Sequence, residues 1–279
     1  MQALTLFNQN FAVAESLLQL YQLFHGMKKT DIKKELRLAI CSFWDAPKNT
    51  ALQSALNDRV MMLAKASTPI PESLTMEGGL DFLLRQAIVV GCTTLEAYFW
   101  DVLRQNVLII VRARKSNADE SLRSLQFTLG DYISIQQYED PEYRLQQIIL
   151  GNFKRGTLSN AESIEKITRI LTIRNFWDGI EQITGTSAKI FKTQIGELIY
   201  RRNQIAHRAD RPEEGEESDS LGLRPITLAW TNLRIQTAKT LVTASNDLIG
   251  KTISRLEEDI QVAKEQEEAR KLVQQLSKE

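Results

Sequence analysis

The sequence predicts an all-α protein, a helical bundle that ends in one long C-terminal helix. Apolar residues recur at steps of three and four along most of the 279 residues, which is the period of amphipathic helices. Helix breakers are scarce, with 13 glycines and 6 prolines. One segment alone, Phe127–Ile135, resembles a strand, and its alternation is weak.

The N-terminal quarter predicts three helices. Apolar positions from Leu4 to Phe24 follow helical spacing, and Gly26 is placed to end this helix in the left-handed conformation. Residues 30–44 and 50–66 predict two further helices, which are separated by a proline-containing connection.

The central part of the chain predicts helices with clear start signals. After the breaker Thr68–Pro71, the segment Leu80–Arg114 predicts a long helix whose centre is apolar enough to be buried. Asp140 followed by Pro141 is typical of a helix N-terminus. Ser159–Glu162 matches a capping box that opens the next helix.

The last third predicts two helices on either side of a polar loop. One helix begins near Thr186 and runs through His207. Residues 209–224 predict the loop, and the helical pattern resumes at Ile226 and lasts nearly to the end.

We divide the chain into three parts on this basis. Residues 1–26 and 77–256 predict the helical core. Residues 27–76 predict a helical insertion, and residues 257–279 predict a charged extension of the last helix.

Composition narrows the classes of function. Lys and Arg number 35, as do Asp and Glu, so bulk positive charge does not favour nucleic acid and any basic site must be local. The two cysteines do not make a disulfide framework, which predicts reduced thiols and a cytoplasmic protein. We find no signal peptide and no apolar run of membrane-spanning length, and therefore expect no membrane partner.

The sequence lacks the usual signals of several chemistries. Its two histidines, His25 and His207, form no closely spaced set of metal ligands. It contains no glycine-rich phosphate loop and no G-x-S-x-G nucleophile elbow. We therefore expect neither a metal ion nor a cofactor.

The segment Tyr200–Arg208 holds the most informative pattern. On a helix, Tyr200, Asn203 and His207 share one stripe, and Arg202 falls among apolar side chains. A guanidinium on an apolar face is costly unless it meets an anion, which could be a buried carboxylate or a substrate phosphate. We expect a polar stripe to face water, and it consists of Gln194, Glu197, Arg201, Gln204 and Arg208.

An arginine and a histidine together suit the cleavage of RNA. The arginine can hold a phosphate and stabilise the charge added in the transition state. The imidazole can give or take a proton near neutral pH. RNA carries its own nucleophile, the 2′-hydroxyl, so this pair could cleave it without a metal ion.

Charge is distributed unevenly around this segment. Residues 189–211 hold six Lys and Arg against two Asp and Glu, a net charge of +4, and could form an RNA groove or a solvated helix face. The RNA-binding candidates are Lys192, Arg201, Arg208 and Arg211. The acidic loop 212–220 follows, and it could be an RNA-mimicking strap over the basic site or a solubilising connection.

Three segments resemble one known family. Arg202–His207 looks like the R-x4-6-H motif of the HEPN superfamily, with a polar residue directly after the arginine. Ile173–Asp178 resembles the segment before the motif helix in the RiboL-PSP branch of that superfamily. Gln86–Tyr98 resembles the long apolar helix of the same branch, with its embedded Leu-Glu-Ala-Tyr.

The resemblance implies a fold and an activity. It implies a HEPN-type helical bundle that pairs as a homodimer, with two motif helices facing each other across one composite cleft. It implies a metal-independent endoribonuclease in which Arg202 and His207 carry the reaction and Asn203 supports them. Family members often act as toxins or in antiviral defence, so the expected partners are RNA, a second copy, and an antitoxin or another defence protein.

Other interpretations stay open. Arg202 and His207 could be a structural pair at the helix end, and the protein a non-catalytic RNA-binding or protein-interaction scaffold, or a purely structural bundle. Glu96 could orient Arg202 or polarise His207, or be an ordinary glutamate, and Tyr200 could contact a phosphate or base, or simply pack. Residues 27–76 look longer than the family's connection, and the loop after His207 is unusually acidic.

Overall fold

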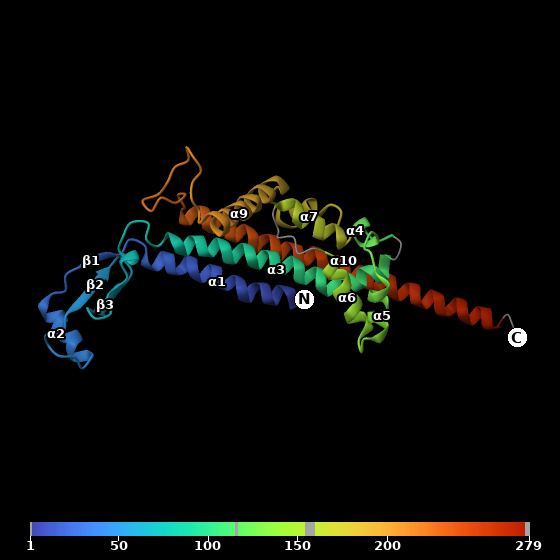
Figure 1. The fold of residues 1–279 in the computed structure, drawn as a ribbon, viewed down its shortest axis with the longest axis horizontal. Helices are drawn as coiled ribbons and strands as arrows, with labels where there is room; N and C mark the ends of the chain where they lie inside the picture. The colour runs from blue at the N-terminus through green and yellow to red at the C-terminus, as the bar shows by residue number, and fades with distance from the viewer. Residues whose placement is uncertain (1, 115–116, 154–159, 277–279) are drawn as a thin grey trace. The chain divides into compact units, whose positions relative to one another are not determined.

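Helices dominate the structure, which confirms the predicted all-α class. A computed structural model describes residues 2–114, 117–153 and 160–276 (Figure 1). A small three-stranded sheet and one 3-10 turn, Glu72–Leu74, accompany the helices. The helices are α1 (Gln2–Phe24), α2 (Lys34–Phe43), α3 (Asp81–Arg114), α4 (Glu120–Arg123), α5 (Leu129–Gln137), α6 (Pro141–Asn152), α7 (Ala161–Ile170), α8 (Phe176–Thr184), α9 (Ala188–Arg208) and α10 (Leu228–Leu276).

The chain divides into two compact units. The first unit holds Met1–Asn10, Cys92–Tyr200 and Gln236–Glu279, and the second holds Phe11–Gly91 and Arg201–Ile235. The long helices α1, α3, α9 and α10 contribute residues to both units. The long helices expected at 80–114 and from 226 onward are confirmed as α3 and the 49-residue α10.

Aromatic side chains build the core of the first unit. Phe7 of α1 meets Tyr98 of α3 edge to face, with ring centroids 5.8 Å apart. Phe99 continues the contact to Phe176 of α8 at 6.2 Å, and Phe176 meets Trp177 at 5.0 Å. Edge-to-face rings of this kind are favoured by the ring quadrupole as well as by burial. The apolar centre of α3 is thus buried, as its composition predicts.

Close approach of helices builds part of the core of the second unit. The neighbours of Gly91 in α3 leave no room for a side chain, because a Cβ atom there would lie 2.5 Å from Cδ1 of Ile235 and 3.7 Å from the ring of Phe11. Phe11 and Ile235 are both almost fully buried. Glycine therefore allows α3 to pack closely against these side chains.

The helix predicted over residues 50–66 is wrong, because this segment forms a β-hairpin. Strand β2 (Leu52–Leu56) pairs antiparallel with β1 (Lys28–Thr30) and β3 (Met61–Lys65), next to α2 in the view of Figure 1. The Asn57 carboxamide makes the turn, since its Oδ1 accepts the backbone N–H of Arg59 and Val60 at 2.9 Å. Predicted helix 30–44 is confirmed over the shorter range of α2.

The strand suggested at Phe127–Ile135 is also wrong, because helix α5 occupies most of it. Thr128 caps α5: its hydroxyl accepts the Asp131 N–H at 3.0 Å, and the Asp131 carboxylate accepts the Thr128 N–H at 2.9 Å. These hydrogen bonds, from the Thr128 backbone and its hydroxyl, lower the pKa of Asp131. The reciprocal cap selects a helix although the apolar pattern is weak.

The other predicted helix ends are mostly confirmed. Asp140 caps α6 by accepting the Tyr143 N–H at 3.0 Å, with Pro141 as the first helical residue. Asn160 caps α7 through Ser163, whereas Ser159 of the predicted capping box lies outside the described residues. Gly26 follows α1 with a φ of 76°. Among the described residues, every helix is too short or too polar to cross a membrane.

Candidate functional site

Helix α9 presents the Arg-His pattern near its C-terminal end. Arg202 is 9% exposed, as expected for a residue on the apolar stripe, while His207 is exposed and Asn203 is half-buried. Five residues separate Arg202 from His207, which is about one and a half helical turns. The local helix therefore holds a buried guanidinium and sets an imidazole in solvent.

Two residues of the predicted water-facing stripe are shielded from solvent instead, one of them buried and the other half-buried. Gln204 is 9% exposed, and the Arg201 side chain is 14% exposed. Arg201 turns toward Asp210, whose Oδ2 accepts a hydrogen bond from Arg201 Nη2 at 2.8 Å. The expectation that these two residues face water is therefore wrong, because the chain after α9 folds back over this side of the helix.

The end of α9 is held in a strained turn. Ala209 and Asp210 both have positive φ values, 51° and 58°, in a region that residues other than glycine rarely adopt. The Asp210 N–H donates to the Gln204 carbonyl at 3.0 Å, and the Arg224 N–H donates to the Asp210 carbonyl at 2.9 Å. Strained residues of this kind persist only where their surroundings hold them, and they often lie at functional sites. Here the strain begins two residues after His207.

A buried ionic cluster holds this turn in place. We call it the Asp210 cluster, and its members are Arg85, Arg201, Asp210, Asp219 and Arg224. Arg85 Nε donates to Asp210 Oδ2 at 2.7 Å, and Arg85 Nη2 donates to Asp219 Oδ2 at 2.9 Å. The guanidiniums of Arg85 and Arg201 both also donate to the backbone carbonyl of Arg224. A buried carboxylate is tolerated where it meets charged donors in this way.

The surroundings of Asp219 favour the ionised form of its carboxyl group. Burial alone would raise the pKa of its carboxyl, but hydrogen bonds from the backbone N–H groups of Leu223 and Leu221, together with Arg85, outweigh burial. The pKa of Asp219 therefore lies below its usual value. The acidic loop thus supplies a negative charge to the Asp210 cluster near neutral pH.

A protein-family sequence model matches the part of the chain that contains this site. The model described as RiboL-PSP-HEPN matches residues 50–226, which is more than half of the chain and includes Arg202–His207. The chain belongs to the RiboL-PSP-HEPN family. No curated protein and no solved structure matches it.

In this RiboL-PSP-HEPN protein, several predicted RNA-binding side chains already make contacts. Lys192 is 3.9 Å from a Glu165 carboxylate oxygen and lies over the ring of Trp177. Arg208, one residue after His207, forms an ion pair with Glu213 of the acidic loop. Arg211 is exposed. Lys192 and Arg208 are still about half exposed, so their charges remain open to solvent.

The two supporting candidates lie in the first unit. Tyr200 is 52% exposed, so it does not belong to the core. Glu96 is half-buried and lines a cavity with Trp100 and Arg104. Its suggested partnership with Arg202 stays a prediction.

Sequence reasoning did not single out the Asp210 cluster of this RiboL-PSP-HEPN protein. Asp210 entered only as one charge among many, and Arg85 lies 125 residues before it. One signal was present: a carboxylate directly after a motif helix, in a segment rich in arginine. No spacing rule connects that carboxylate with Arg85 on another helix.

Proposed function

We propose that this protein is an endoribonuclease that cleaves RNA without a metal ion at a site built around Arg202 and His207. One observation carries the proposal: the R-x4-6-H pattern ends α9 with its imidazole in solvent, in a chain that belongs to the RiboL-PSP-HEPN family. A histidine there can exchange protons with RNA and water.

The proposed reaction uses the 2′-hydroxyl of RNA as the nucleophile. His207 takes the proton of this hydroxyl, its oxygen attacks the adjacent phosphorus, and the bond from phosphorus to the 5′-oxygen breaks. The leaving oxygen takes a proton from an imidazolium. The products are a 2′,3′-cyclic phosphate and a free 5′-hydroxyl. Arg202 binds the phosphate and stabilises the charge that develops on it, and Asn203 hydrogen-bonds the phosphate or His207.

We further propose that two copies pair through their motif helices. Two copies place two histidines in one cleft, so that one acts as base while the other acts as acid. The exposed Tyr200 lies on the same stripe of α9 as Asn203 and His207, and a large aromatic on such a stripe suits a helix interface. The mass of the protein in solution, measured by light scattering, tests the pairing.

The basic side chains around the motif would hold the RNA strand. Lys192, Arg208 and Arg211 supply exposed or half-exposed charge, which favours phosphates without regard to sequence. Arg201 would act differently from our first expectation, because its guanidinium is engaged by Asp210. In this proposal Arg201 positions the end of α9, and Glu96 and Tyr200 remain candidates for contacts at the site.

A second candidate function rests on the burial of Arg202. A guanidinium that is 9% exposed could have a structural role only, in which case the protein would be an RNA-binding or protein-interaction scaffold. The same burial also fits catalysis, since a side chain fixed before substrate arrives needs little rearrangement to hold a phosphate. Cleavage assays separate the two functions.

The decisive experiment measures cleavage of bulk RNA in the presence of EDTA. We expect Arg202→Ala and His207→Ala each to lower the rate at least about a hundredfold, the range for loss of an acid-base group or a charge-stabilising donor. His25→Ala is the matched control, because His25 is exposed and is the other histidine of the chain. Circular dichroism checks that each variant is folded.

Two outcomes would contradict catalysis by this pair. One is cleavage that appears only when a divalent metal ion is added. The other is a folded His207→Ala variant that cleaves at the wild-type rate. Products that lack a cyclic phosphate would contradict attack by the 2′-hydroxyl.

We further propose that the protein acts in the cytoplasm of a prokaryote as a toxin or an antiviral-defence effector. An antitoxin or another defence protein would control its activity. Expression in bacteria tests this setting. Wild-type protein should arrest growth, and His207→Ala should relieve the arrest. Growth arrest that persists with a folded His207→Ala protein would contradict the role of a ribonuclease toxin.

A further inference from the structure

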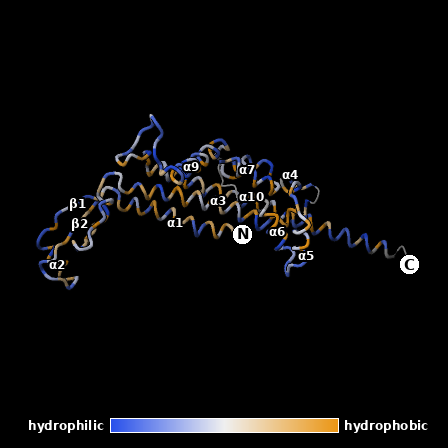
Figure 2. Tube along the Cα trace, viewed as in Figure 1, coloured by the Kyte–Doolittle hydropathy of each residue, from blue (hydrophilic) through white to orange (hydrophobic). Residues whose placement is uncertain are grey.

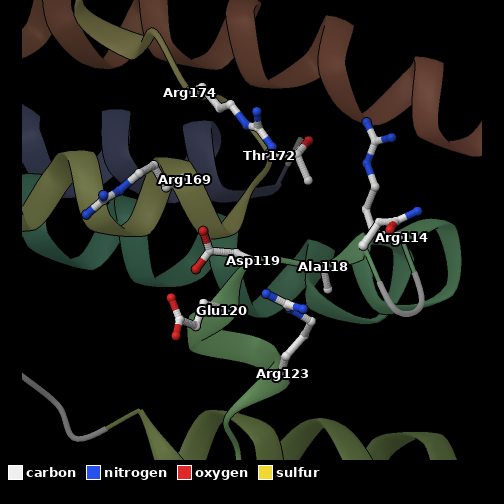
Figure 3. Close-up of a pocket in the computed structure, with 9 residues that line it drawn as sticks. Arg114, Ala118, Asp119, Glu120, Arg123, Arg169, Thr172 and Arg174 are labelled. Carbon is white, nitrogen blue, oxygen red and sulfur yellow. The ribbon is translucent and has the colours of Figure 1, made fainter.

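The first unit contains an arginine-rich cavity that the ribonuclease proposal does not use. Its volume is about 810 Å³, and Figure 3 shows the side chains that line it. Four arginines contribute to the lining, and they come from separate segments: Arg114 ends α3, Arg123 ends α4, Arg169 lies in α7, and Arg174 lies just before α8. The chain thus brings arginines from four separate segments to the lining of one cavity.

The residues that line this cavity carry more positive than negative charge. Asp119 and Glu120 also line it, so that four positive charges face two negative charges and leave a net charge of +2. Within the described part of the chain, none of the four arginines forms an ion pair with a carboxylate. Arginines that line one cavity and form no ion pair with its carboxylates favour binding of an anion.

The wall of the cavity includes a strained residue. Thr172 has a φ of 67°, a conformation that is a genuine outlier for a β-branched side chain. Its N–H donates to the Arg169 carbonyl at 2.8 Å, and its buried hydroxyl has no hydrogen-bond partner among the described residues. Thr172 lies in the turn between Arg169 and Arg174, and all three residues line the cavity. Strained residues often lie at functional sites, and a buried polar atom without a partner is rare, so both features support a binding site here.

We propose that this cavity binds a free nucleoside diphosphate or triphosphate, with the phosphates on the arginines and the sugar hydroxyls on Asp119 or Glu120. A planar guanidinium binds phosphate oxygens in pairs, and all four cations are arginines. A carboxylate is a natural acceptor for ribose hydroxyls, whereas it would repel a continuous phosphate chain. The volume falls within the usual range for small-ligand sites. The proposal stands apart from the ribonuclease site.

Calorimetric titration of the whole protein tests the proposal. The ligands are ATP, GTP, inorganic tripolyphosphate and a single-stranded RNA with a 5′-hydroxyl end. We expect the two nucleotides to bind with micromolar dissociation constants, and tripolyphosphate to bind at least about tenfold more weakly, because it lacks the sugar. The His207→Ala variant is used with RNA so that RNA is not cleaved.

Variants of exposed residues locate the site. Arg123→Ala combined with Arg169→Ala should weaken nucleotide binding about a hundredfold, because each charged contact removed accounts for about tenfold. Arg255→Ala is the matched control, since Arg255 is an exposed arginine in the first unit that does not line the cavity. Glu120→Gln should bring the affinities for nucleotide and tripolyphosphate closer together. Thermal unfolding checks that each variant is folded.

Each remaining outcome overturns the proposal. No detectable heat with either nucleotide at 1 mM excludes the site. Equal affinity for tripolyphosphate and nucleotide excludes recognition of the nucleoside. Displacement of bound nucleotide by the 5′-hydroxyl RNA identifies the cavity as part of an RNA path instead. An Arg255→Ala variant as weak as the double variant would show that general charge, and not this cavity, binds the ligand.

Discussion

Arg85 Nε donates a hydrogen bond to Asp210 Oδ2 at 2.7 Å, although the two residues are 125 positions apart in the sequence. Their side chains are 7% and 1% exposed. The contact connects α3 to the turn that directly follows the motif helix α9. Because that turn contains two residues with positive φ, the ion pair supplies an interaction that can hold a strained end of α9 in place.

Replacing Asp210 by asparagine should destabilise the protein strongly. Asp210→Asn leaves the buried guanidiniums of Arg85 and Arg201 without their shared anion, and loss of one partner from a buried pair costs about 3–5 kcal/mol. Chemical denaturation measures the free energy of unfolding. Asp259→Asn, on an exposed position of α10, is the control and should change it by less than about 0.5 kcal/mol. A loss below about 1 kcal/mol for Asp210→Asn would show that the cluster contributes little.

Asp219 should make stability depend on acid pH. Its pKa is lowered in the folded protein, so the folded protein binds this proton less tightly than the unfolded chain, whose pKa is near 3.9. The stabilisation is complete above the unfolded pKa and is lost as the pH falls through the lower, folded value. The difference in melting temperature between wild type and Asp219→Asn should therefore narrow as the pH is lowered from 6 to 3. A difference that stays constant would contradict ionisation of Asp219 as the cause.

The long helices could be predicted because their signals are local. The apolar period of α3 and α10, the proline after Asp140, and Gly26 after α1 all lie within a few residues of the feature that they specify. The placement of Arg202 on the buried side of α9 follows from the same period.

The predictions for residues 50–66 and for Arg201 were wrong because single polar side chains there form hydrogen bonds that the apolar period does not reveal. Residues 50–66 carry apolar residues that fit a helix, but the Asn57 carboxamide makes a turn and donates to the carbonyls of Leu23 and His25. In the same way, Asp210 draws Arg201 away from solvent. Periodicity gives the faces of a helix but not the partner that approaches each face, and so the Asp210 cluster could not be predicted.

Gly91 should be less tolerant of alanine than a glycine in open surroundings. In Gly91→Ala the new methyl group would lie 2.5 Å from Cδ1 of Ile235, so that the Ile235 side chain or the helix must shift. We expect a loss of about 1–3 kcal/mol in the free energy of unfolding, as in other overpacked cores. Gly196→Ala in α9 is the control, because its Cβ would meet nothing within 4 Å, and it should stabilise by about 0.5–1 kcal/mol. Equal effects of the two substitutions would contradict close packing at Gly91.

The acidic loop should weaken RNA binding through one particular glutamate. Figure 2 shows a mainly hydrophilic segment between α9 and α10, and in it Glu213 pairs with Arg208, the residue after His207. Glu214 is also exposed, and no ion pair of Glu214 is found among the described residues. Glu213→Gln and Glu214→Gln remove the same charge from neighbouring positions, but only Glu213→Gln releases Arg208 for a phosphate.

We therefore expect Glu213→Gln to raise RNA affinity about two- to fivefold more than Glu214→Gln does, since an exposed ion pair accounts for at most about 1 kcal/mol. Fluorescence anisotropy at low salt, with both changes made in a His207→Ala background, measures the affinities without cleavage of the RNA. Because Arg208 gains a phosphate, the dependence of log affinity on log salt should also steepen by about one charge for Glu213→Gln alone. If both variants bind RNA equally well, the loop acts only through its total charge, and the Glu213–Arg208 pair does not restrain the site.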